Sequence, residues 1–303
     1  MLAPENPLRQ KAYMTAQPFR RRRSVLYVPA LNERALAKLP GLACDAVVID
    51  LEDSVAPARK QEARQALKGF LAAREDDGKE IVVRINALST EWGRDDLAAA
   101  LACSPDSILI PKVETARDVL EVNDLLDQSG ADPDLQLWAM VETPRAVVEI
   151  AAIASLGRDK GARLSCLVAG TNDLVKDTGI RATPDRRWLV PWLMQMVLAA
   201  RAGGVDILDG VSNDFSNLEA FAAECAQGRE MGFDGKTLIH PAQIAPANQA
   251  FSPSEDEVAE ALAVREAFAL PENQAKGVIS INGKMVERLH LQQAERLLAK
   301  AGL

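Results

Sequence analysis

The sequence is short of several residue types, and each shortage removes a class of function. Its 303 residues include two histidines, His240 and His290, so a histidine-rich zinc site is excluded by count. The four cysteines are far apart and form no CxxC pair, which favours buried thiols in a reducing compartment. A bound metal would therefore be held mainly by oxygen, which points to Mg²⁺ or Mn²⁺.

Excess positive charge and long apolar runs are also missing. The net charge of −8 argues against a nucleic-acid partner, which requires a basic surface. No run approaches the roughly 18 apolar residues of a membrane span. The N-terminal stretch MLAPENPLRQKAYMTAQPF has no apolar signal-peptide core, so we expect a cytoplasmic protein with a flexible arm over residues 1–22.

Short apolar runs rich in Val and Ile recur along the chain, separated by segments of helix length. They predict eight strands at 24–30, 45–52, 80–86, 107–113, 136–142, 164–170, 205–211 and 235–240. The intervening segments 58–75, 142–156 and 216–232 have apolar residues at helical spacing. This alternation predicts an α/β protein with a (β/α)₈ TIM barrel over residues 23–250, and a doubly wound open sheet is the weaker alternative.

Residues 251–303 follow a barrel that is already complete. The pattern indicates a helix, then a hairpin or strand in GVISINGKMV, then a final helix. We interpret this segment as a helix–hairpin–helix appendage that a barrel does not require. The four arginines at 20–23 precede the first strand, so we expect a solvated or oligomer-facing patch there.

Polar residues recur where the predicted strands end, and a barrel places these ends at one mouth. Five acids at such positions would repel one another, and Arg84 and Lys112 offset only part of their charge. A bound divalent cation resolves this conflict. Glu142 and Asp173 form the best pair of metal ligands, because they follow neighbouring strands and Mg²⁺ takes its other ligands from water and substrate.

Further roles follow from the same mouth. We assign substrate binding to Arg84, Asn86, Lys112 and Glu142, since Arg84 can fork onto a carboxylate. Two other interpretations stay open: GTNDL as a tight turn with an N-cap, and Lys112 as a Schiff-base lysine, although Glu114 would pair with it and keep it charged.

Several motifs then follow one another in an order that resembles a known family. They are RRSVLYVPALNERALAKL, DAVVIDLEDSVAPARKQEAR, VVRINAL, ILIPKVET, VETPRAV, GTNDL, GFDGKTLIHPAQI and INGKMVERLHLQQAERLL. Across residues 22–300 the sequence resembles the citrate lyase β-subunit-like family within the HpcH/HpaI aldolase superfamily.

The resemblance implies a Mg²⁺-dependent acyl-CoA lyase that cleaves or forms a short β-hydroxyacyl-CoA such as malyl-, citramalyl- or citryl-CoA. The products are acetyl-CoA and a keto acid. Glu142 and Asp173 correspond to the metal ligands and Arg84 to the substrate-binding arginine. The resemblance also implies a homotrimer, or a hexamer of trimers, in which the appendage covers the active site of an adjacent subunit.

One position departs from the family pattern. Many of its lyases carry an aspartate before GKM in the lid segment, whereas this sequence has Asn282, which cannot exchange a proton at neutral pH. Cleavage would then need another acid or base, or the activity has moved to thioester hydrolysis on the same scaffold. A class II pyruvate aldolase and a non-catalytic citrate lyase-type subunit are the remaining alternatives.

The stretch VIDLEDSVAP carries three acids directly after an apolar run. Strand side chains alternate, so we expect Asp50 and Glu52 to share a face and Asp53 to turn away. We assign Asp50 and Glu52 to catalysis together with Arg84, either by orienting Arg84 or by accepting hydrogen bonds from metal-bound water. Glu52 is therefore expected near the metal but not bound to it.

Overall fold

The computed structural model describes residues 20–303, and most of the predicted arm 1–22 lies outside them. Clustering of contacts divides the chain into two units. One spans Arg22–Ser252, and the other includes Pro253–Leu303. Within the described residues, no helix combines the length and apolar character needed to cross a membrane.

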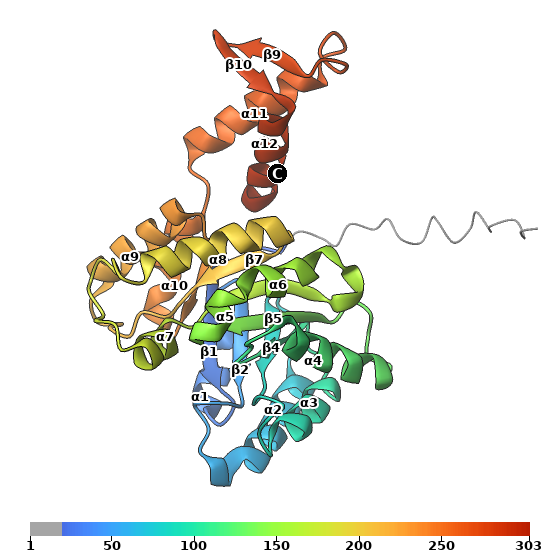
Figure 1. Ribbon diagram of the computed structural model, residues 1–303, viewed down its shortest axis with the longest axis vertical. Helices are drawn as coiled ribbons and strands as arrows, with labels where there is room; N and C mark the ends of the chain where they lie inside the picture. Colours follow the sequence, from blue (N-terminus) through green and yellow to red (C-terminus); the bar gives the residue numbers. More distant parts are fainter. Residues whose placement is uncertain (1–19) are drawn as a thin grey trace, which may run out of the picture. The chain divides into compact units, whose positions relative to one another are not determined.

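The first unit is a closed barrel of eight parallel strands in sequence order, as predicted, with helices outside the strands (Figure 1). Its strands are shorter than the predicted apolar runs, because strand pairing ends before the last residues of each run. They are β1 Ser24–Pro29, β2 Ala46–Asp50, β3 Glu80–Arg84, β4 Ser107–Ile110, β5 Gln136–Val141, β6 Leu164–Ala169, β7 Asp206–Asp209 and β8 Gly235–Leu238.

The helices of the barrel follow the strands with short connections. They are α1 Glu33–Leu36, α2 Lys60–Ala73, α3 Gly93–Leu101, α4 Ala116–Gln128, α5 Pro144–Val148, α6 Ile150–Ser155, α7 Thr171–Thr178, α8 Val190–Gly203, α9 Leu218–Met231 and α10 Ile244–Phe251. The segment expected to form one helix over 142–156 is two, because Glu149 leaves the helical region with φ −91° and ψ 6°. Asn217 caps α9 by accepting from the Ala220 N–H at 3.1 Å, as its sequence position suggested.

Two apolar layers hold the barrel together. The larger one lies between the strands and the helices, and the smaller one fills the inside of the barrel. Every second residue of a strand points into the barrel. The inner layer includes Val25, Ala46, Val48, Val82, Leu109, Trp138, Met140, Cys166, Val168 and Leu208. The mouth therefore rests on a filled core and not on an open pore.

Arg22 closes the opposite, N-terminal end of the barrel. Its guanidinium donates two hydrogen bonds to Glu80, at 2.8 and 2.9 Å, and one to Asp206 at 2.9 Å. It also stacks on Trp138 at 4.8 Å, and only 7% of Arg22 is exposed. The expectation of a solvated arginine patch is therefore wrong for Arg22, because its charge is buried against two carboxylates.

The second unit contains α11 Glu255–Ala269, β9 Val278–Ile281, β10 Lys284–Glu287 and α12 Arg288–Ala301. The two helices lie side by side, and the antiparallel hairpin extends from one end of the pair (Figure 1). A small core of Ala261, Ala294 and Leu298 holds the helices together. This matches the predicted helix–hairpin–helix pattern, whereas its role as a lid stays a prediction.

Candidate active site

Arg84 and Asp50 form the best-defined contact at the mouth. Both close their strands, β3 and β2, and they pair directly in the barrel register. The Arg84 Nε and Nη2 donate to the two Asp50 carboxylate oxygens at 2.6 and 2.7 Å. Asp50 also accepts from the backbone N–H groups of Glu52 and Ser54. This two-pronged contact fixes the plane of the guanidinium and leaves Nη1 for other partners.

Glu52 and Asp53 approach that remaining nitrogen. The Arg84 Nη1 lies 2.9 Å from Glu52 Oε2 and 3.9 Å from Asp53 Oδ2. The expectation that Asp53 turns away assumed a continuous strand, but β2 ends at Asp50 and the following residues form turns. All three acids therefore lie around one guanidinium, with Asp53 at the exposed rim.

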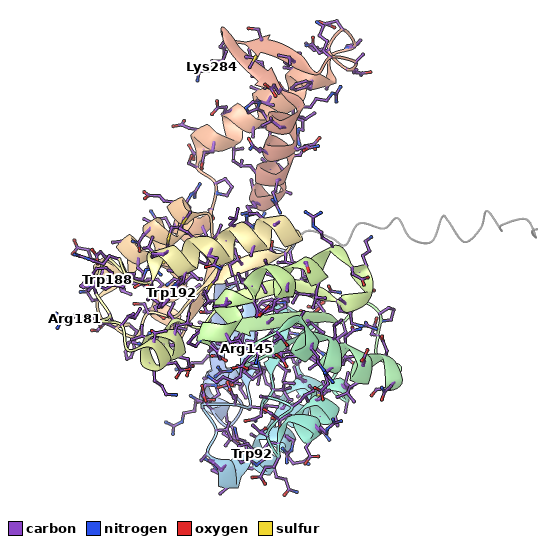
Figure 2. All side chains as sticks on the ribbon, viewed as in Figure 1. Trp92, Arg145, Arg181, Trp188, Trp192 and Lys284 are labelled. Carbon is purple, nitrogen blue, oxygen red and sulfur yellow. The ribbon has the colours of Figure 1, made fainter. Side chains whose placement is uncertain are left out.

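Lys112 joins the two proposed metal ligands. Its backbone N–H donates to Glu142 Oε1 at 2.7 Å, and its Nζ lies 3.3 Å from Glu142 Oε2 and 3.0 Å from Asp173 Oδ2. Glu142 and Asp173 thus lie near each other, as expected from neighbouring strands, whereas their role as metal ligands stays a prediction. Glu114, proposed as the partner of Lys112, instead lies 3.7 Å from Arg145, a residue of α5 (Figure 2).

The donor set fits a divalent cation. Glu142 Oε2 is buried and accepts no hydrogen bond in the described chain, and an ammonium group lies against both carboxylates. Within residues 20–303 no set of three His, Cys, Asp or Glu side chains is arranged around one metal position. A cation held by Glu142 and Asp173 would thus complete its coordination with water or substrate oxygens, as Mg²⁺ prefers.

Two acids at the mouth, Glu52 and Glu142, have raised pKa values. The pKa of Glu52 is raised to about 8, by burial first and then by nearby Glu142, Asp53 and Asp50, against the opposing effect of Arg84. Burial also raises the pKa of Glu142, although Lys112 opposes this shift.

Two other acids at the mouth stay ionised. Burial opposes ionisation of Asp50, but the Arg84 guanidinium outweighs it and lowers the pKa. For Asp173, burial is outweighed by the hydrogen bond from Lys112, and the pKa is again lowered. Paired acids next to proton-holding acids are an arrangement common at functional sites.

Asn86 lies beneath the mouth, where its side chain is fully used. Its amide nitrogen donates to the Leu51 carbonyl at 2.9 Å and to Asp96 at 2.5 Å. Its amide oxygen accepts from the Lys60 Nζ at 2.9 Å, and 3% of the residue is exposed. These bonds tie the loop that carries Glu52 to the end of β3. Asn86 therefore supports this loop, and its predicted contact with substrate would require these bonds to break.

Other polar strand ends face away from this centre. Asp209 is buried between Arg186 and Lys236, each at 2.8 Å, so it belongs to an ion-pair cluster beside α9. His240 stacks on Phe215 at 4.7 Å and accepts from the Ala242 N–H. Asn172 of GTNDL exchanges two hydrogen bonds with Asn213.

Sequence reasoning missed Tyr27, whose ring lies 4.9 Å below the Arg84 guanidinium. The signal that could have found it is its place in β1, two residues before Pro29, which pairs with Asp50. An aromatic residue at that inward position necessarily lies under the mouth.

Asn282 forms the tip of the β9–β10 hairpin together with Gly283. Their φ angles are +51° and +77°, and Lys284 follows them at the start of β10 (Figure 2). A two-residue hairpin turn with both φ angles positive favours Asn followed by Gly. The turn therefore explains the asparagine locally, and Asp would satisfy the same backbone.

Comparisons with known proteins identify the family of this chain. The family model described as HpcH/HpaI aldolase/citrate lyase matches residues 23–241. A (3S)-malyl-CoA thioesterase from Cereibacter sphaeroides is 48% identical over 286 residues, which cover 94% of this chain and 95% of the relative. The citrate lyase subunit beta of Escherichia coli is 33% identical over 289 residues, with 94% of each chain covered.

A solved structure agrees as well. CitE from Mycobacterium tuberculosis, in complex with magnesium, acetoacetate and coenzyme A, superposes with a TM-score of 0.72 at 31% identity. The match covers 92% of this chain and 98% of CitE. A closed barrel of eight parallel strands with helices outside it defines the (β/α)₈ TIM-barrel class. Within that class, this chain belongs to the HpcH/HpaI aldolase/citrate lyase family, a family of enzymes, as its motifs indicated.

Proposed function

We propose that the protein is a Mg²⁺-dependent thioesterase that hydrolyses a short 3-hydroxyacyl-CoA of the malyl-CoA type. The observation that carries the choice of hydrolysis is the 48% identity, along almost the whole chain, to (3S)-malyl-CoA thioesterase. Asn282 supports it, since this amide supplies no proton-exchanging group for C–C cleavage. This proposal reverses the order of the sequence-based hypotheses, in which the lyase came first.

Glu142 and Asp173 would hold the metal ion. Mg²⁺ in this position supplies Lewis-acid polarisation of oxygens on the acyl group. The relatives solved with magnesium and with coenzyme A support both ligands. Lys112, half-exposed beside the two carboxylates, is placed to bind the carboxylate of the acyl group once a metal neutralises Glu142 and Asp173.

Arg84 would bind an oxygen of the thioester. Asp50 positions it by occupying Nε and Nη2, so that Nη1 is the nitrogen presented to the substrate. A preorganised cation at this point stabilises negative charge as it develops on that oxygen. We propose that Asn86 has no contact with substrate and instead holds the loop of Glu52 in place through Lys60 and Leu51.

Glu52 would move the proton. Its buried Oε2 lies 2.9 Å from the Arg84 Nη1, and a pKa of about 8 lets the carboxyl hold or release a proton near neutrality. In hydrolysis, a water oxygen bonds to the thioester carbon and the C–S bond breaks. The proton lost by water passes through Glu52 to the CoA sulfur, which leaves free CoA and the hydroxy acid.

The second candidate is the lyase reaction, which the 33% identity to citrate lyase subunit beta favours. Incubation with malyl-, citramalyl- and citryl-CoA plus Mg²⁺ separates the two. Hydrolysis releases free CoA with the hydroxy acid intact, whereas cleavage releases acetyl-CoA and a keto acid. Glu142→Ala and Asp173→Ala should abolish either activity, and unchanged turnover in both variants would show that the metal ligands are misassigned.

Two further outcomes address the remaining alternatives. Turnover of free keto acids without CoA would indicate a class II pyruvate aldolase. Activity that requires added citrate lyase-type partner subunits would indicate a subunit of a larger complex. The homotrimeric or hexameric assembly stays a prediction, which sedimentation of the purified chain tests.

A further inference from the structure

Tyr27 spans the barrel directly beneath the mouth. It extends from β1, and its hydroxyl lies 3.8 Å from the Met140 sulfur of β5, which is four strands away in a ring of eight. The phenol ring packs against the inner core, and the residue as a whole is half-buried. Tyr27 and Met140 together therefore form the floor of the candidate active site.

Arg84 lies on top of this floor. Its guanidinium carbon is 4.9 Å from the centre of the Tyr27 ring, and its Nη1 is 3.7 Å from the same Met140 sulfur. The phenol O–H and a guanidinium N–H thus both point toward the Met140 sulfur, from two sides. Two converging donors on one point are the geometry by which proteins bind an oxyanion.

The Met140 sulfur is a poor partner for the Tyr27 hydroxyl, whereas the Arg84 Nη1 also lies 2.9 Å from Glu52 Oε2. A thioether sulfur is a weak acceptor, and within residues 20–303 the Tyr27 hydroxyl donates to this sulfur. A strong donor left without a strong acceptor in a partly buried site is unfavourable by roughly 1–3 kcal/mol. A carbonyl oxygen that replaced the sulfur between the two donors, with the flexible Met140 side chain moved aside, would relieve that cost.

The Tyr27 phenol also stays protonated under working conditions. Burial raises its pKa above the usual range, and Asp50, Glu142 and Glu52 raise it further against the opposing effect of Arg84. It therefore acts as a donor and does not exchange its proton near neutral pH.

We propose that Tyr27 and Arg84 together bind the thioester carbonyl oxygen of the substrate, with the Tyr27 hydroxyl as a catalytic hydrogen-bond donor. This inference rests on the proposed function only in taking a CoA thioester as substrate. Negative charge develops on that same oxygen in hydrolysis and in C–C cleavage, so the role of Tyr27 does not depend on which reaction occurs.

Tyr27→Phe tests the proposal, because it removes the hydroxyl and keeps the ring beneath Arg84. Loss of one oxyanion donor should lower kcat by about 10²-fold with little change in KM. The melting temperature should stay at or above that of the wild type, since a poorly paired donor is removed. Ser129→Ala, which removes an exposed hydroxyl bonded to the Leu125 carbonyl at the end of α4, is the control and should leave kcat unchanged.

A kcat that is unchanged in Tyr27→Phe overturns the proposal. So does a rise in KM at constant kcat, which would indicate ground-state binding of a different substrate group. A large fall in the melting temperature of Tyr27→Phe would also overturn it if added Mg²⁺ alone restored both the melting temperature and kcat. The hydroxyl would then have a structural role.

A spectroscopic experiment keeps this test separate from the proposed function. Acetyl-CoA labelled with ¹³C at the carbonyl is bound to the Mg²⁺-loaded protein, and its carbonyl stretch is measured by difference infrared spectroscopy. Two donors should shift the stretch to lower frequency, and Tyr27→Phe should lose part of that shift. An equal shift in both proteins overturns the role of Tyr27, even if neither hydrolysis nor cleavage of malyl-CoA is detected.

Discussion

Lys112 contacts both carboxylate oxygens of Glu142, one through its backbone and one through its side chain. The backbone N–H lies 2.7 Å from Oε1, and Nζ lies 3.3 Å from Oε2. Lys112 has φ +51°, an uncommon backbone conformation for a residue other than glycine. This conformation turns its N–H and its ammonium group toward the same acid. This backbone geometry at the mouth is an outlier of the kind found at functional sites.

The first prediction concerns competition between this lysine and Mg²⁺. Because the Lys112 ammonium lies against Glu142 and Asp173, it repels a divalent cation held by the same carboxylates. Lys112→Met should bind Mg²⁺ roughly tenfold more tightly in calorimetric titration without substrate, a change of about 1.4 kcal/mol. Turnover should nevertheless fall, since substrate loses a cationic partner.

Lys176→Met is the matched control for that experiment. Lys176 lies 3.7 Å from Asp173 but is largely solvated, so its charge is screened and Mg²⁺ affinity should change little. Weaker binding of Mg²⁺ in Lys112→Met would contradict the assignment of the cation to this pair of acids.

The second prediction concerns Gly170, the residue before α7. A β-carbon at this position would lie 2.3 Å from the Glu142 Cβ and 3.0 Å from its Oε2. Gly170→Ala should therefore push Glu142 out of place and lower both Mg²⁺ affinity and kcat by at least about tenfold, since misplaced ligands lose most of their effect. Gly69→Ala in α2 meets no atom within 4 Å and should only stabilise its helix.

The third prediction concerns the pH dependence of stability in Mg²⁺-free buffer. The pKa of Glu52 is about 8 in the folded protein, above the value of about 4.3 expected for an unfolded chain. The folded state thus binds the proton more tightly, and the stability from the protonated acid is complete below pH ~4.3. It is lost as pH rises, and the loss levels off above pH ~8.

Glu52→Gln removes this titration and keeps the shape of the side chain. Its thermal stability relative to the wild type should increase from pH 5 to pH 8 and then stay constant. Glu62→Gln is the control: its hydrogen bond to Arg59 lowers the pKa of Glu62, so the difference from wild type should be flat over that range. A flat profile for Glu52→Gln would mean that Glu52 is ionised in the folded protein.

The fold and the ends of its strands were predictable because they depend on local patterns. Apolar runs mark the strands, and barrel closure then fixes which ends are neighbours, so Glu142, Asp173 and Arg84 could be located at one mouth from spacing alone. The same reasoning placed Asp50 beside Arg84, because β2 and β3 pair in register.

Other features depend on side-chain directions that a linear pattern does not encode. Lys112 pairs with Glu142 because of its left-handed backbone, and Asp53 reaches the rim because β2 ends early. Tyr27 looks like an ordinary strand residue until β5 is placed opposite β1. Arg22 reads as part of a surface patch until Glu80 and Asp206 converge on it.

The last prediction concerns Asn282 at the hairpin tip. Aspartate tolerates a positive φ nearly as well as asparagine, so Asn282→Asp should leave the melting temperature within a few degrees of the wild type. If the hairpin covers an active site in the assembled protein, this substitution adds the carboxylate that C–C cleavage lacks. The ratio of cleavage to hydrolysis of malyl-CoA, measured as keto-acid product against free CoA, should then rise at least several-fold.

Ser280→Asp provides the charge-matched control for that substitution. Ser280 is exposed on β9 and pairs with Met285 across the hairpin, so an aspartate at this position adds the same charge outside the turn. We expect its product ratio to match the wild type. If Asn282→Asp folds but also keeps the wild-type ratio, the choice between hydrolysis and cleavage is made at the barrel mouth, by Glu52 and its surroundings, and not at the hairpin tip.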